Sequence, residues 1–298
     1  MRRIVRTLTL GLVLVVAALV VPNSTVAATQ AALVKVDRAQ GIDYGPHVIW
    51  ILAVGSDARP GEDMLRTRGD ALQLIGLNTR TGAATAIGIP RDSYVPIPGR
   101  GSDRVNAALY YGGPQLLGRT VGDLVGIEPE YVFVTRFPFF EDMVDEIGGI
   151  HVRNPRFFSD THLKSNGFKP GRIHLDGYGA MAFARIRKSL PAGDFDRSAN
   201  QQRVLRGIQS TIREKARRPG FMERGVLSVM EHLHTDLPPS ELFRLAQAVA
   251  QVDPRKITSC VVQGGIGDVG GASVVLPYVD QARRYGDQAR KDATIERC

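Results

Sequence analysis

The stretch VIWILAVGSDAR, residues 48–59, begins with an uninterrupted apolar run and ends in small and charged residues. A short apolar run without polar alternation predicts a strand that is buried on both faces, as in the centre of an α/β sheet. Residues 71–77 repeat this pattern, and a turn at 78–82 leads into a third strand at 83–89. We therefore expect these three segments to form the centre of a sheet.

Segments with helical and strand periodicity alternate along the rest of the chain. This mixture predicts an α/β fold, which we expect to be a three-layer α/β/α sandwich with a central mixed β-sheet. The Gly-rich residues 264–271 lack the Lys and the spacing of a phosphate-binding loop and are expected to form a flexible turn. Helices are expected at 104–111, 114–125, 139–147, 176–183, 196–217, 223–234, 240–251 and 278–288, and further strands at 131–135 and 257–262.

The N-terminus has the pattern of an export signal. Three arginines, Arg2, Arg3 and Arg6, precede an uncharged and mostly apolar run at 8–21. This length suits either a cleaved signal peptide or an uncleaved signal anchor, and both place the rest of the chain outside the cytoplasm. We expect a signal segment at 1–22, a linker at 23–46 and one catalytic domain at 47–298, with a motif core at 48–202 and C-terminal helices and a strand at 203–298.

Composition excludes several classes of protein. The chain has 298 residues, of which 43% are hydrophobic, so it is long enough and apolar enough to fold around a substantial core. Its formal charge of +8 includes the three N-terminal arginines, and the sequence has no zinc-finger or recognition-helix pattern. Nucleic acid is therefore not expected as a partner.

The chain has two cysteines, Cys260 and Cys298. In an exported protein they are able to form one disulfide that closes the C-terminal region. The alternative is two unpaired thiols, one of them at the chain terminus.

Arginines and aspartates gather where the expected strands and helices end. Clustered guanidinium groups repel one another unless an anion lies among them, and the planar fork of arginine pairs with two phosphate oxygens. Nearby carboxylates suggest a hard cation that bridges the same phosphates. The pattern predicts an anion site with a metal, built from Gly55–Arg59, Arg68–Asp70, Ile89–Asp92, Arg104–Asn106, Arg185–Arg187 and Asp194–Gln201.

Five blocks between Val48 and Gln202 resemble the LytR-CpsA-Psr family in order and spacing. They include IPRDSYVPIPG at 89–99, NAALYYGGP at 106–114 and the RIR, GDFDR and Gln elements at 185–201. The resemblance implies a membrane-associated phosphotransferase that depends on Mg²⁺, with Mn²⁺ as a substitute. Enzymes of this family transfer a glycopolymer from polyprenyl pyrophosphate to peptidoglycan as a phosphodiester. A donor held in the membrane also favours the uncleaved anchor.

The resemblance assigns roles to individual residues. Arg104 stands where the family often has Lys, so its role carries over with a change from a compact ammonium to a broad fork. Asp57 and Asp70 match the metal ligands, and the residues that match the pyrophosphate ligands are Arg59, Arg68, Arg91, Arg104, Arg185, Arg187, Arg197 and Gln201.

Transfer of this kind needs charge neutralisation and positioning more than a nucleophilic residue. We therefore count Arg91 among the catalytic residues. Asp194 is the candidate for binding the acceptor hydroxyl or accepting its proton, and Asp92 is its rival. The alternative for both carboxylates is an ion pair that orients a neighbouring arginine.

Arg185 and Arg187 share a face only if the chain is extended between them. We therefore expect the preceding helix to end near Phe183; if it continues, the two side chains diverge. The aromatic and aliphatic residues from Phe133 to Ile150 are expected to be ordinary core, and none is assigned to lipid.

Two other functions use the same residues. The first is a hydrolase that splits the polyprenyl pyrophosphate with water, and the second is a noncatalytic lipid-glycan binding or regulatory protein. The identity of the glycopolymer is left open between teichoic acid, arabinogalactan and capsule.

Overall fold

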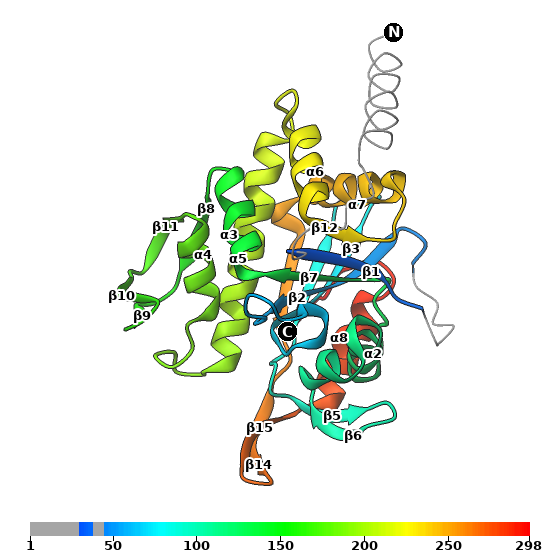
Figure 1. Cartoon of the computed structure of the whole chain (residues 1–298), viewed down its shortest axis with the longest axis vertical. Helices are drawn as coiled ribbons and strands as arrows, with labels where there is room; N and C mark the ends of the chain where they lie inside the picture. Colours follow the sequence, from blue (N-terminus) through cyan, green and yellow to red (C-terminus); the bar gives the residue numbers. More distant parts are fainter. Residues whose placement is uncertain (1–29, 38–44) are drawn as a thin grey trace.

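Seven strands form one mixed sheet at the centre of the computed structural model, which describes residues 30–37 and 45–298 (Figure 1). The strand order is β12-β1-β7-β2-β3-β4-β13, in which β2 is antiparallel to β3 and parallel to β7. The prediction of an α/β fold with a central mixed sheet is confirmed. The strands are β1 (Ala31–Lys35), β2 (Val48–Ser56), β3 (Gly69–Asn78), β4 (Ala84–Gly88), β7 (Tyr131–Arg136), β12 (Leu233–Thr235) and β13 (Ile257–Val261).

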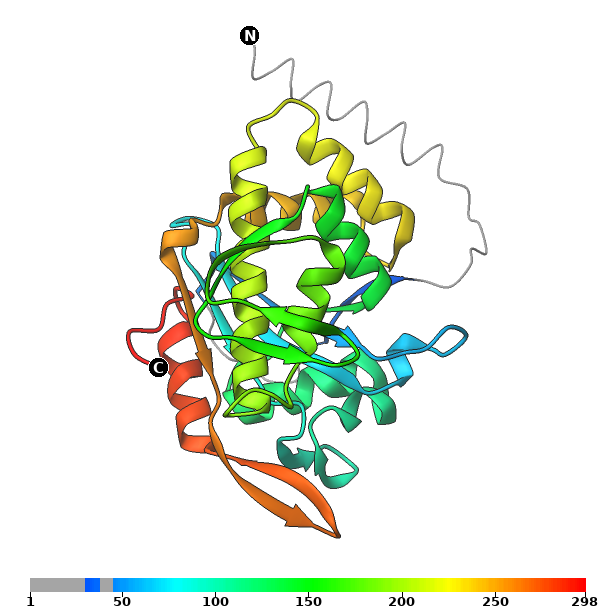
Figure 2. The same ribbon diagram turned by 90° about the vertical axis from the view of Figure 1, so that its left-hand side faces the viewer.

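Helices cover both faces of this sheet (Figures 1 and 2). Helices α2 and α8 pack on one face, where they share a core with Trp50 and Leu52. On the other face α7 packs against Ile49 and Tyr131, and α3, α4 and α5 form a second helical group with its own core. The described α-helices are α2 (Ala107–Val125), α3 (Phe137–Glu146), α4 (Gly177–Arg185), α5 (Asp194–Lys215), α6 (Phe221–His232), α7 (Pro239–Gln251) and α8 (Val279–Ala289).

At the centre of the sheet, a large side chain of β2 packs over a glycine of β3. Trp50 in β2 is fully buried and lies directly opposite Gly76 in β3. A Cβ atom on Gly76 would stand 2.6 Å from the indole ring, so glycine leaves the space that the ring fills.

Four two-stranded ribbons and two short 3₁₀ helices complete the described fold. The ribbon β8–β11 packs against α5, and the ribbon β14–β15 projects at the lower end of the molecule in Figure 1. The bounds are β5 (Tyr94–Ile97), β6 (Gly101–Arg104), β8 (Ile150–Asn154), β9 (Phe158–Asp160), β10 (Lys164–Phe168), β11 (Gly171–Leu175), β14 (Gly264–Val269), β15 (Ala272–Pro277), η1 (Met64–Arg66) and η2 (Pro254–Lys256).

Two expectations from the sequence are wrong. The segment expected to be a linker contains β1, which is buried between β7 and β12. The flexible turn expected at 264–271 is instead strand β14 and its turn into β15, because cross-strand pairing stabilises a strand that is rich in glycine.

Helix boundaries also differ locally. Arg104 ends strand β6, and a single helix, α2, replaces the two expected near it. Gly113 interrupts that helix with φ 67°, immediately before Pro114, so the expected break survives as a kink. The helix expected to reach residue 234 ends at His232, and strand β12 follows.

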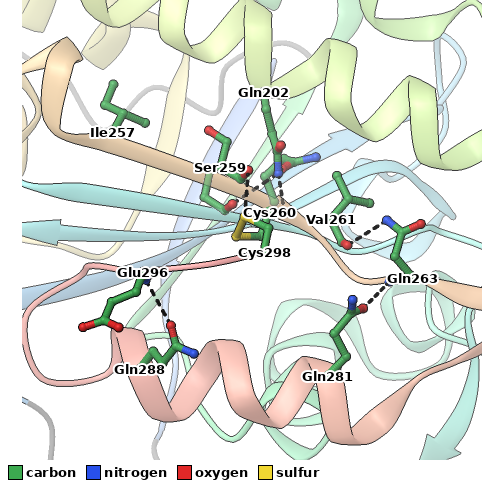
Figure 3. Close-up of a disulfide and its surroundings, with 12 residues drawn as sticks. Gln202, Ile257, Ser259, Cys260, Val261, Gln263, Gln281, Gln288, Glu296 and Cys298 are labelled. Carbon is green, nitrogen blue, oxygen red and sulfur yellow. Dashed lines mark hydrogen bonds between the residues drawn. A yellow bond between two sulfur atoms is a disulfide. The ribbon is translucent and has the colours of Figure 1, made fainter.

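Cys260 and Cys298 form a disulfide that ties the end of the chain to β13. Figure 3 shows the bridge beneath Gln202 of α5, whose side-chain amide donates a 2.7 Å hydrogen bond to the Cys260 carbonyl. The disulfide alternative is therefore the correct one. It joins two positions that are 38 residues apart and encloses β14, β15 and α8.

The expected signal segment at 1–22 lies outside the described residues, as does most of the expected linker. Among residues 30–37 and 45–298, no helix combines the length and apolar character needed to cross a membrane.

Candidate active site

The two candidate metal ligands meet at the end of the β2–β3 pair. Asp57 directly follows β2, and Asp70 is the second residue of β3, with Ser56 and Gly69 paired between the strands. Because the strands are antiparallel and joined by the loop 57–68, both carboxylates lie at the same edge of the sheet. The sequence analysis expected Asp57 and Asp70 in one site, and this edge brings them together.

Arginines surround this carboxylate pair. Arg91 donates a hydrogen bond to Asp70 Oδ1, and Arg185 Nη2 lies 3.4 Å from Asp57 Oδ1 and 3.8 Å from Asp70 Oδ2. Partial burial raises the pKa of Asp57, and the negative charge of Asp70 raises it further. A bound cation between the two carboxylates would relieve this repulsion.

The other two candidate carboxylates, Asp92 and Asp194, lie among arginines next to the Asp57–Asp70 pair. Asp92 Oδ1 lies 3.8 Å from Arg91 Nε and 3.7 Å from Arg104 Nε, and Asp92 Oδ2 lies 3.4 Å from Arg187 Nη1. The same Arg187 nitrogen is 3.4 Å from Asp194 Oδ1. The structure therefore brings both candidate carboxylates into one charged cluster.

Helix α5 supplies the most buried charge of this cluster. Arg197, only 5% exposed, lies with Nη2 2.6 Å from Asp194 Oδ1, one helical turn away. Burial lowers the pKa of Arg197, while the charge of Asp194 opposes that shift. Leaving one of these two charges without the other would cost several kcal/mol, on the order of 3 to 5.

Three polar atoms of the cluster are buried without a hydrogen-bond partner among the described residues. They are Asp194 Oδ2, Arg91 Nε and Arg104 Nε. Buried polar groups are nearly always satisfied, so the two arginine N–H groups indicate a place for ligand oxygens, and the Asp194 oxygen indicates a place for a donor such as a hydroxyl group.

Helix α4 ends two residues later than predicted, and Arg185 and Arg187 nevertheless reach the same site, as expected. The helix ends at Arg185 and not near Phe183, and Ile186 is already extended. Both guanidinium groups still reach the cluster, because the change to extended backbone occurs between them. Arg185 also stacks on Phe137, with its central carbon 4.1 Å from the ring centroid, which restricts its orientation.

Arg59 and Arg68 stand apart from the cluster. Both are exposed on the loop 57–68, and neither makes an ion pair with a carboxylate in the described part of the chain. The buried Arg136 holds this loop through hydrogen bonds to the carbonyls of Ala58, Arg59 and Glu62. Sequence analysis missed this role because the partners are backbone atoms of a segment far away in the chain.

Gln201 is anchored by a residue that the sequence analysis also missed. The buried Gln73 of β3 donates a 2.9 Å hydrogen bond to Gln201 Oε1, and Gln201 Nε2 donates to the Ala184 carbonyl at 3.4 Å. A polar residue inside an otherwise apolar strand was the available signal. The pair joins β3, α4 and α5 directly behind Arg197.

A largely apolar cavity of about 180 Å³ opens onto the charged cluster. It lies between the sheet and the helices α3, α4 and α5, and Asp70, Arg185 and Arg197 line its polar end. Four aromatic and aliphatic residues expected to be core line its wall, namely Phe133, Phe137, Phe140 and Met143. Phe139 and Ile150 are core residues as expected.

The donors present fit a magnesium ion. Mg²⁺ in phosphate sites takes one or two carboxylates and completes its shell with phosphate oxygens and water. Asp57 and Asp70 supply that number, and the described residues contain no group of three or more His, Cys, Asp or Glu residues that could form a closed protein cage. A site of this kind is open to a phosphate ligand.

The chain is similar to proteins of known sequence and structure. The polyisoprenyl-teichoic acid–peptidoglycan teichoic acid transferase TagU of Bacillus anthracis is 35% identical over 196 residues, which are 65% of this chain and 62% of that protein. The crystal structure of B. subtilis TagV superimposes with a TM-score of 0.69 at 25% identity and covers 85% of this chain and 100% of that one. TagT bound to LIIa-WTA gives a TM-score of 0.67 at 25% identity, covering 88% and 96%.

The match to the family model extends over residues 19–291 and includes the β2–β3 edge, the arginine cluster and the disulfide-bonded β13. The chain therefore belongs to the LytR_cpsA_psr family.

Proposed function

We propose that this protein is an extracytoplasmic phosphotransferase that moves a glycopolymer from a polyprenyl-pyrophosphate carrier to peptidoglycan as a phosphodiester. The observation that carries the proposal is the position of the apolar cavity, whose polar end is formed by Asp70, Arg185 and Arg197. A lipid pyrophosphate has the same division between a long apolar chain and a compact, highly charged group. The TagU relatives carry the name of a transferase of this kind, although the match spans only 62% of their length.

In this proposal the arginines of the cluster have different roles. Arg91, Arg185, Arg187 and Arg197 bind the pyrophosphate oxygens and neutralise the charge that develops on them. Arg104 stands at the edge of the cluster, where its guanidinium also holds the Ser273 carbonyl at 2.7 Å. Arg59 and Arg68, exposed on the loop 57–68, would reach the ligand only if that loop closes over it.

The proposed reaction needs no covalent enzyme intermediate. An acceptor hydroxyl attacks the phosphorus bonded to the glycan, a new P–O bond forms, and the bridging P–O bond of the pyrophosphate breaks. Polyprenyl phosphate leaves with the electron pair, and the hydroxyl proton passes to the unpaired Oδ2 of Asp194. Asp92 contacts three arginines and is therefore assigned to positioning them.

Asp57 and Asp70 would hold Mg²⁺, or Mn²⁺ in its place, which would supply positive charge next to the pyrophosphate oxygens. We also propose that the N-terminal apolar segment at 8–21 keeps the domain at the membrane, where the lipid carrier lies.

The direct test incubates the purified full-length chain with a short synthetic glycan on polyprenyl pyrophosphate, with and without peptidoglycan fragments, and with Mg²⁺ or EDTA. Mass spectrometry should detect a phosphodiester-linked conjugate only when both acceptor and metal are present. Released glycan phosphate without a conjugate would identify a hydrolase. Tight binding without turnover would identify a binding or regulatory protein.

A further inference from the structure

The outward face of the β8–β11 ribbon carries only basic or titratable side chains in its centre. The strands alternate strictly, so His151 and Arg153 of β8 point outward while Ile150 and Val152 are buried against α5. On β11, Arg172 and His174 are exposed in the same way. Figure 2 shows this ribbon on the face turned toward the viewer, in front of α5.

These side chains are aligned so that residues of the same type face each other. Arg153 lies directly opposite Arg172, and His151 lies directly opposite His174, with the two imidazole centroids 5.1 Å apart. Neither arginine makes an ion pair or a side-chain hydrogen bond with another described residue. Like charges directly opposite each other destabilise a ribbon, so the alignment has a cost that a bound anion would remove.

The ribbon follows α5 toward the N-terminal end of that helix. Ribbon and helix run alongside each other, with Thr211 Oγ1 3.4 Å from the Gly149 carbonyl and Arg156 Nη1 3.4 Å from Asp196 Oδ2. Asp194, two residues before Asp196, projects to another side of α5, toward Arg187 and Arg197. From residue 211 of α5 to residue 196 the helix extends roughly 22 Å at its usual rise.

Carboxylates near this face are few. Asp196 pairs with Arg156 and also lies near Arg203, and Glu214 lies near His151. Burial lowers the pKa of His151 and the charges of Arg172 and His174 lower it further, whereas Glu214 opposes them. The net character of the face is positive even with both imidazoles neutral.

We propose that this basic track, defined as His151, Arg153, Arg156, Arg172 and His174, binds an anionic glycan whose repeating units carry phosphate or carboxylate groups. The proposal rests on the proposed function, because it gives the glycan beyond the pyrophosphate a path away from the reacting phosphorus. The track is narrow and ends at the first turn of α5, which carries the arginine cluster on its other side. The paired positions 151, 153, 172 and 174 carry no large apolar side chain of the kind that inserts into a membrane surface, and the exposed Phe157 lies beside Arg156 at one end of the track.

The test compares the variant Arg153→Gln/Arg172→Gln with the control Arg119→Gln/Arg284→Gln. The control removes the same charge from exposed positions of α2 and α8, on the opposite face of the sheet. Full-length proteins in nanodiscs of neutral lipid are supplied with two donors of the same prenyl chain, one carrying a glycerol-phosphate oligomer and one carrying a neutral disaccharide. Binding of the free glycerol-phosphate oligomer is measured in parallel.

In the track variant we expect kcat/KM for the anionic donor, divided by that for the neutral donor, to fall about three- to tenfold, with a matching loss of oligomer binding. At high salt, the track variant and the wild-type protein should differ less, both in this kcat/KM ratio and in oligomer binding. An unchanged ratio, or an equal change in the control, would overturn the proposal. So would arginine-dependent binding to anionic vesicles without any effect on the oligomer, because the face would then serve a membrane.

The two proposals fail in different ways. If the wild-type protein turns over neither donor, the phosphotransferase assignment is wrong. Binding of the free oligomer to the wild-type protein, to the track variant and to the control still decides whether the track exists.

Discussion

Asp57 illustrates, at the scale of one residue, how a ligand site lowers the stability of its own fold. Its raised pKa means that the folded protein holds the Asp57 proton more tightly than the unfolded chain does. Stability therefore falls as the pH rises from the unfolded pKa through the folded pKa, and it stays lower at neutral pH.

We accordingly expect Asp57→Asn to stabilise the metal-free protein at about pH 7. At a pH of about 3 we expect no gain, because the Asp57 side chain is then protonated and as neutral as the amide that replaces it. The gain should stay below about 1 kcal/mol, because the side chain is 56% exposed and solvent screens its charge. Urea unfolding in EDTA measures this, with Asp142→Asn on α3 as the exposed control. Turnover should be lost in Asp57→Asn, and lower stability at neutral pH would contradict the account.

Arg197 and Asp194 allow a test of coupling within the cluster. Arg197→Met should cost about 3 kcal/mol of unfolding free energy, because it leaves a buried carboxylate with Arg187 alone. Adding Asp194→Asn to that variant should recover most of the loss. A double-mutant cycle by urea unfolding measures the coupling, and additive effects of the two changes would show that the pair is not a unit.

At the scale of elements, the β14–β15 ribbon acts as a support for the active site. The backbone N–H of Val275 donates a 2.9 Å hydrogen bond to the Asp92 carbonyl, and the Ser273 carbonyl accepts from Arg104. Val275→Pro removes that N–H. It breaks no backbone hydrogen bond between β15 and β14, because the N–H of Val275 points away from β14 and toward Asp92.

Turnover in the assay proposed above should fall about tenfold in Val275→Pro through the displaced Asp92 and Arg104, a change of about 1.4 kcal/mol in the barrier. Val275→Ala is the matched control, since it keeps the N–H and loses only the side chain. Equal activities of the two variants would show that the ribbon has no role in positioning the site.

Elements with strong periodicity were predictable from the sequence, and elements held by partners were not. The apolar runs of β2 and β3 and the long helix α5 contain their own signal. Strand β1 is short, and β14 is rich in glycine, so each becomes a strand only through the strand beside it. The two wrong expectations have this common cause.

The candidate site divides in the same way. Motif residues such as Asp70 and Arg91 were recognisable because they lie next to elements that the sequence predicted. Gln73 and Arg136 act through backbone and side-chain partners that only the tertiary structure supplies. The exposed positions of Arg59 and Arg68 were likewise invisible in the sequence, because motif spacing does not report whether a loop is folded back.

At the scale of the whole molecule, the apolar cavity lies between two separately built units, the sheet and the α3–α5 group. Its wall residues look like core in the sequence because they belong to core-forming elements. Side-chain packing normally fills the space between such layers. A cavity that remains open and ends at three charged residues is therefore better explained as a binding site than as a packing fault.

A large side chain placed in the cavity should therefore weaken lipid binding and leave the phosphoryl-transfer residues unchanged. Ala184 of α4 lines the wall, and its backbone carbonyl accepts a hydrogen bond from Gln201. Ala184→Phe should raise KM for a donor with a long prenyl chain at least tenfold, because each buried CH₂ excluded from the cavity forfeits about 0.8 kcal/mol. With a donor of two isoprene units the KM should change little, since the charged end of the site is intact.

Thermal unfolding of Ala184→Phe should match or exceed that of the wild-type protein, because the ring fills empty space. Ala184→Ser is the control, since it keeps the volume nearly unchanged. Equal KM increases for long and short donors would mean that the ring disturbs the arginine cluster and that the cavity does not hold the lipid. Selective loss of the long-chain donor would tie the cavity to the prenyl chain independently of the transfer chemistry.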